Sequence, residues 1–175
     1  GQASADELDG LEPLSGGARL EPLIGPAAYA RLRVELMVQG LRDDTIERLK
    51  PWAAMLRITR ADRQPDARSL DEDLFAAARA RRMHVWSLEA AEEQAASFDT
   101  VPVDSQVALL THVLARRDSP LAATEPAIAA WLRGDLRAIA RLPAKAADRF
   151  PAMRVHYTRL VEHIIHDRTT LLHHR

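Results

Sequence analysis

The stretch "VWSLEAAEEQ", residues 85–94, decides how the rest of this chain is interpreted. Residues 85–88 are mostly apolar and predict a short β-strand, whereas Glu89 begins a run of residues that favour helix. An ionised carboxylate is costly in a buried position, so Glu89 needs a reason to lie where the strand ends. Because one strand cannot satisfy its own backbone groups, we expect it to lie at the edge of a helical bundle or to join a sheet supplied from outside.

Helical patterns dominate on both sides of this stretch. Residues 25–40 have Pro26 at a first-turn position and Gly40 just after the end, and Pro51 begins a later helix. The predicted fold class is mainly α: a multi-helix domain of about eight helices with one short β-strand. A polar N-terminal segment (1–20) precedes this single helical domain (21–175). The expected core residues are Trp52, Leu74, Phe75, Trp86, Leu110 and Trp131, with Leu70, Ala77 and Ala78 also facing inward.

Composition excludes several classes of function. Lys and Arg total 24 against 25 Asp and Glu, so the formal net charge of −1 gives no electrostatic sign of nucleic-acid binding. The absence of cysteine excludes disulfides, thiolate metal sites and a cysteine nucleophile. There is no membrane-length apolar run, no signal-peptide pattern, no Gly-x-Ser-x-Gly and no phosphate-binding loop.

The last predicted helix contains five of the seven histidines. Projected at about 100° per residue, they fall away from the apolar arc formed by Leu160, Val161, Ile164, Ile165, Leu171 and Leu172. His163 and His166 are three residues apart and could share a divalent cation, with further ligands from carboxylates or a partner chain. The alternative is a solvated, pH-sensitive face.

Arg168 falls in the middle of that apolar arc. A guanidinium directed into a core is costly unless a carboxylate meets it, and its fork suits a carboxylate or phosphate. We expect Glu89 or a substrate as its partner, in either a structural or a functional pair. Glu89 itself is a candidate general base or metal ligand. The alternative for Glu89 is a helix cap or a first-turn charge, which needs no chemistry.

Five segments in this order resemble the TraB/GumN/PrgY family, whose wider group includes the Tiki proteases of animals. The resemblance covers roughly residues 18–175. Neither of the family's two Gly-x-x-His motifs is present in this chain. The segments are "LEPLIGPAAYARLR" (20–33), "LKPWAAML" (49–56), the block from Ser69 to Leu110, "WLRGDL" (131–136) and "DRTTLLHHR" (167–175).

The resemblance implies the helical central part of a larger α+β metal-dependent hydrolase that acts on peptides or small molecules. Glu89 matches the family's central glutamate, Gln94 its glutamine, and Arg168 the arginine near the last helix. The implied cofactor is a divalent metal (Mn, Co or Zn) whose ligands lie largely outside this chain, as do the two histidine motifs and most of the sheet. The implied setting is bacterial and extracytoplasmic or periplasmic, and this segment alone would be inactive.

Two other functions remain open from the sequence. One is a non-catalytic helical module for peptide binding or self-association, which predicts an exposed apolar groove and a homo-oligomer. The other is metal sequestration by the histidine face. Convergence of Glu89, Gln94 and Arg168 on one cleft would favour the hydrolase over the binding module. Competition by a chelator, and loss of binding in His163→Ala, would identify metal sequestration.

Overall fold

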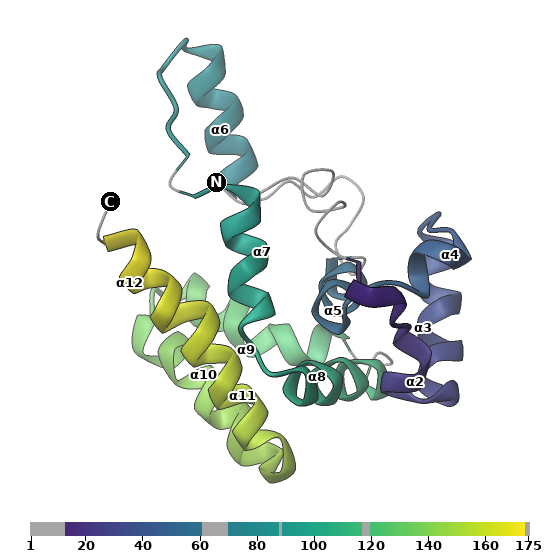
Figure 1. Cartoon of the computed structure of the whole chain (residues 1–175). Helices are drawn as coiled ribbons and strands as arrows, with labels where there is room; N and C mark the ends of the chain where they lie inside the picture. The colour runs from purple at the N-terminus through teal and green to yellow at the C-terminus, as the bar shows by residue number, and fades with distance from the viewer. Residues whose placement is uncertain (1–12, 61–69, 88, 117–119, 174–175) are drawn as a thin grey trace.

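The computed structural model describes residues 13–60, 70–87, 89–116 and 120–173. The chain is built from helices that follow one another along the sequence (Figure 1). No described helix has the length and apolar character needed to cross a membrane. The α-helices are α2 (Leu20–Ile24), α3 (Pro26–Val38), α4 (Asp43–Ile46), α5 (Pro51–Arg60), α6 (Leu70–Ala80), α7 (Ala91–Asp99), α8 (Val103–Ala115), α9 (Pro120–Leu132), α10 (Leu136–Arg149), α11 (Arg154–Val161) and α12 (Arg168–His173), and the shorter turns are η1 (Ser15–Gly17), η2 (Pro151–Met153) and η3 (Glu162–Asp167).

The helix boundaries expected from proline and glycine are confirmed. Pro26 opens α3, and Gly40 follows it with φ of 87°, a left-handed conformation that glycine adopts without steric cost. Pro51 opens α5. The last predicted helix is present as one unbroken helical span from Pro151 to His173, in which η2, α11, the π-helical turn η3 and α12 follow one another.

The predicted strand is wrong over the residues that the structure describes. Residues 83–87 have no regular secondary structure, and Leu88 lies outside the described residues. β-type pairing within the described ranges consists of one isolated antiparallel bridge between Pro13 and Leu49. Residues 83–87 follow α6 back toward the body of the molecule (Figure 1), and no described strand lies beside them to supply the backbone partners of a β-ladder.

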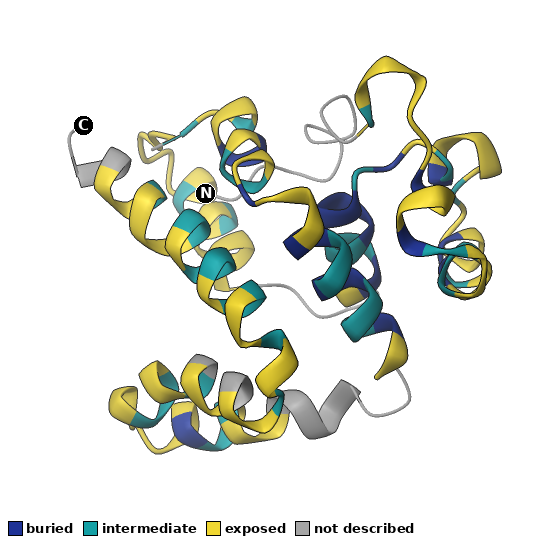
Figure 2. Cartoon of the chain, turned by 60° about the horizontal axis from the view of Figure 1, so that its bottom comes forward, coloured by how far each residue is buried: buried dark blue, intermediate teal, exposed yellow. Residues whose placement is uncertain are grey.

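The hydrophobic core lies between α2, α3, α4, α5, α7 and α8 (Figure 2). Leu32, Leu36, Trp52, Leu110 and Leu114 are each at most 1% exposed. Figure 2 shows that α11 and α12, in contrast, are mostly exposed or half-buried. The core is therefore concentrated on one side of the chain, with the C-terminal helices packed against α7 and α8.

Four of the six expected core residues are on the surface. Trp52 and Leu110 are buried as predicted, but Leu74, Phe75, Trp86 and Trp131 are between 49% and 78% exposed. Leu70, also expected to face inward, is 64% exposed. For Leu70, Leu74 and Phe75 the reason is that α6 projects from the body (Figure 1), so its apolar face lies in solvent within the described structure.

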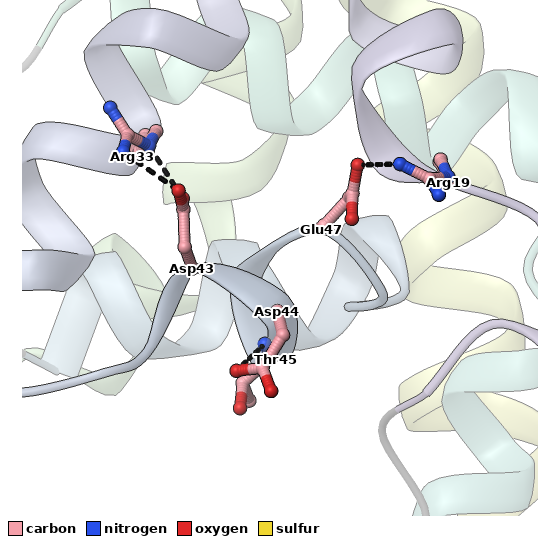
Figure 3. Close-up of polar contacts among 6 residues, drawn as sticks. All are labelled: Arg19, Arg33, Asp43, Asp44, Thr45 and Glu47. Atoms are coloured by element: carbon pink, nitrogen blue, oxygen red, sulfur yellow. Dashed lines mark hydrogen bonds and ion pairs between the residues drawn. The ribbon is translucent and has the colours of Figure 1, made fainter.

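Surface ion pairs hold the N-terminal helices to one another (Figure 3). Arg33 on α3 donates two hydrogen bonds to Asp43 on α4, one of them 2.7 Å from Nη2 to Oδ2. These hydrogen bonds from Arg33 hold the pKa of Asp43 below its usual range. Arg19 Nη1 donates a single hydrogen bond to Glu47 Oε1, which connects the segment before α2 to the end of α4.

An aromatic cluster joins α8 to the C-terminal helices. The ring of His112 lies 4.8 Å from that of Phe150 and 6.1 Å from that of Tyr157, both centroid to centroid. The guanidinium of Arg116 lies over the Phe150 ring at 4.3 Å. Burial, and then the charge of Arg116, lower the pKa of His112. Burial also raises the pKa of Tyr157.

The lowered pKa of His112 predicts a pH dependence of stability. The unfolded chain, where a histidine pKa is about 6.5, binds this proton more readily than the folded chain does. The contribution of His112 to the free energy of unfolding is therefore fully present above that pH. It should be lost as the pH drops from about 6.5 through the folded pKa. His112→Phe keeps a ring in place but cannot be protonated, so its free energy of unfolding should fall less between pH 7.5 and pH 5. Urea denaturation at several pH values measures this, with the exposed His166→Gln as control. An unchanged pH dependence in His112→Phe would contradict the prediction.

Candidate functional site

Glu89 lies at the junction between the extended residues 83–87 and α7. The hydroxyl of Ser87 donates to the backbone carbonyl of Glu89 at 2.5 Å. The N-terminal backbone of α7 is capped by another side chain, because Glu93 accepts a hydrogen bond from the Ala90 N–H at 2.8 Å. Because Ala90 is the N-cap of α7, Glu89 is not the cap itself, although its charge lies at the positive end of the helix dipole. The carboxylate of Glu89 has a separate partner.

That partner is Arg168, at the start of α12. Arg168 Nε donates to Glu89 Oε2 at 2.8 Å, and Nη2 donates to Oε1. The two residues are 79 positions apart in the sequence. The Glu89 side chain is 8% exposed and the Arg168 side chain 25%. The expected pairing is thus present as a bidentate contact, the geometry in which a guanidinium orients a carboxylate most firmly.

The π-helical turn η3 leads directly into Arg168. It occupies Glu162–Asp167, immediately before Arg168, and packs against α7. Its wider turns replace the i→i+4 bonds of an α-helix with i→i+5 bonds, and such turns are frequent at functional sites. Gln94, the third residue expected in the site, is 5% exposed on α7. The structure therefore places Glu89, Gln94 and Arg168 on elements that meet at one junction.

The two histidines proposed as metal ligands lie on η3 but have different surroundings. His163 Nδ1 is 3.2 Å from Asp167 Oδ2, one helical turn away, and His166 is exposed. Within the described part of the chain, no group of three His, Cys, Asp or Glu side chains could hold a metal ion. A metal site that uses these residues would need ligands from elsewhere.

A second polar cluster, which sequence reasoning missed, joins α8 to α11. His156 Nδ1 and Arg159 Nη1 each lie 3.0 Å from the hydroxyl oxygen of Ser105, and Arg159 also donates to Asp104 at 2.8 Å. The hydrogen bond from Arg159 lowers the pKa of Asp104. Ser105 is 0% exposed, so its hydroxyl cannot meet a substrate, and the cluster holds two helices together. Its only sequence signal is the pair His156 and Arg159, which share one helix face.

The comparisons with known proteins give one positive result. No curated protein and no solved structure matches the chain. The sequence profile of the TraB/PrgY/gumN family, however, matches residues 2–174, which is nearly the whole chain. This match agrees with the resemblance expected from the five ordered segments. The chain therefore belongs to the TraB/PrgY/gumN family.

Proposed function

We propose that this chain supplies Glu89 and Arg168 to the site of a metal-dependent hydrolase that acts on peptides. Family membership gives the context, and one observation supports the proposal most directly. This observation is the bidentate pair between two largely buried side chains 79 positions apart. Ionisable groups brought together away from water are more often functional than surface ion pairs are, because their desolvation has a cost.

In this proposal each of the two side chains has a distinct role. Arg168 holds both oxygens of the Glu89 carboxylate and fixes its plane. Each carboxylate oxygen keeps a lone pair beyond its bond to Arg168, so Glu89 can accept a proton from an attacking water. A divalent metal (Mn, Co or Zn), when bound, would supply Lewis-acid chemistry to such a reaction. The described residues do not form a metal site by themselves, so the further ligands would come from outside them.

Peptide hydrolysis by a protein that contains this chain together with the metal ligands outside it, measured after separate equilibration with manganese, cobalt and zinc, tests the proposal. Removing a general base typically costs a factor of 10² to 10⁴, so Glu89→Gln should reduce the rate by at least about 100-fold. Glu92→Gln is the matched control, because Glu92 is an exposed acid in the first turn of α7. Elemental analysis of both variants shows whether Glu89 is also needed for metal retention. Equal rates in the two variants would overturn the proposal.

A non-catalytic peptide-binding module is the second candidate. The observation that favours it is the set of exposed apolar side chains on α6 and on residues 83–87. This function predicts binding of an apolar peptide that is weakened by Leu74→Ser and unchanged by Glu89→Gln. Calorimetric titration of both variants with the same peptide therefore separates the two candidates.

A further inference from the structure

The segment 70–87, here called the arm, carries an apolar surface that the described structure leaves uncovered. Helix α6 rises from the body, and residues 83–87 return beside it (Figure 1). Leu70 and Leu74 are 64% and 59% exposed, and Met83 and Trp86 are 58% and 78% exposed. Single exposed apolar residues are ordinary, but several gathered on one projecting element are typical of an interaction site.

The apolar residues of α6 are spaced for contact with another helix. Leu70 and Leu74 are one turn apart, and Ala77 and Ala78 continue the same face toward the end of the helix. The two alanines allow the backbone of a second helix to come close, while the leucines supply the area to be buried. The helix of 11 residues is about 16 Å long, enough for three turns of helix packing.

The two ends of α6 carry opposite charges. The first turn of α6 contains Asp71, Glu72 and Asp73. The other end contains Arg79, followed by Arg81 and Arg82 just after the helix. A lone helix also favours acids first and bases last, because of its dipole. That preference accounts for the order of the charges but not for the exposed leucines between them.

We propose that a second copy of this chain covers the arm, with the two α6 helices packed antiparallel about a two-fold axis. In that arrangement the acidic end of each helix meets the basic end of its partner, and the two leucine–alanine faces meet between them. A two-fold axis needs a self-complementary patch, and the arm is one. A parallel arrangement would place like charges together, which opposes it. The proposal is independent of the hydrolase activity.

Sedimentation velocity of the full chain over a range of concentrations tests this assembly. The wild-type chain should dimerise, and the double variants Asp71→Arg/Asp73→Arg and Arg81→Asp/Arg82→Asp should each be weakened at least about tenfold, because each then has like charges at both ends of α6. An equimolar mixture of the two variants should recover the dimer, since basic and acidic arms then meet. This recovery distinguishes lost complementarity from a variant that has simply failed to fold.

Two further variants complete the design. Leu74→Ser should also weaken the dimer, whereas Val38→Ser, at a site 85% exposed on α3, should leave it unchanged. Circular dichroism of each variant confirms that the helices are intact. A chain that stays monomeric throughout overturns the proposal and leaves a different polypeptide as the occupant of the arm. A dimer unaffected by both charge variants also overturns it, because another surface would then be responsible.

Discussion

Trp52→Ala is expected to lower the free energy of unfolding by about 4 kcal/mol, within the range for a large buried aromatic residue. The Trp52 side chain is 1% exposed and its ring stacks on Phe98 at 5.0 Å between centroids. Its indole N–H donates to Asp99 Oδ1 at 2.8 Å, and Lys50 pairs with the other carboxylate oxygen of Asp99. The substitution therefore removes core volume and a hydrogen bond that connects α5 to the end of α7.

The two other tryptophans are matched controls for this result. Trp86 and Trp131 are 78% and 66% exposed, so Trp86→Ala and Trp131→Ala should each change the free energy of unfolding by less than about 0.5 kcal/mol. Urea denaturation followed by circular dichroism measures all three, since tryptophan fluorescence would change with the substitution itself. A large loss of stability in Trp86→Ala, measured at low protein concentration, would mean that the arm packs against the body of the same molecule.

Arg168→Ala is expected to cost about 3 kcal/mol of stability, because it leaves the carboxylate of Glu89 without its cation at a site 8% exposed. This value is at the lower end of the range for a buried ion pair, since Arg168 itself is 25% exposed. The matched control is Arg154→Ala. Arg154 pairs with Asp148 at 3.0 Å, but both side chains are at least 60% exposed. The free energy of unfolding should therefore fall by less than about 1 kcal/mol in Arg154→Ala.

A double-mutant cycle isolates the energy of the Glu89–Arg168 pair. The variants are Arg168→Ala, Glu89→Ala and the combination, each measured by urea denaturation. The double variant should be more stable than the sum of the two single losses predicts, because neither charge is then left buried alone. Strictly additive losses would show that the two side chains do not interact in solution.

Much of the helical framework could be predicted because its signals are local. Proline at a first turn and glycine after a last turn act on neighbouring dihedral angles, so Pro26, Gly40 and Pro51 mark helix ends whatever the tertiary context. Burial is different. The spacing of Leu70 and Leu74 shows that α6 has an apolar face, but spacing cannot show whether anything covers it. The strand prediction was wrong for the same reason, since residues 85–87 have strand-like side chains but no partner in the described structure.

The candidate site was predictable where the position of one charged residue required an oppositely charged partner. Arg168 among apolar neighbours required a carboxylate, and Glu89 was the carboxylate whose own position needed an explanation. The cluster around Ser105 created no such requirement in the sequence, because serine, histidine and arginine are ordinary on a helix surface. His156 and Ser105 are 51 positions apart, and only the packing of α11 on α8 brings them into contact.

The turn η3 has a consequence for comparing this chain with its relatives. A π-helical turn behaves as an α-helix into which one residue has been inserted. A family member with a regular α-helix over the same span should therefore be one residue shorter, and a correct alignment should open a single gap between positions 161 and 168. Without that gap, the counterpart of Arg168 would be assigned to a neighbouring column, and the covariation between that arginine and the glutamate at position 89 would be lost.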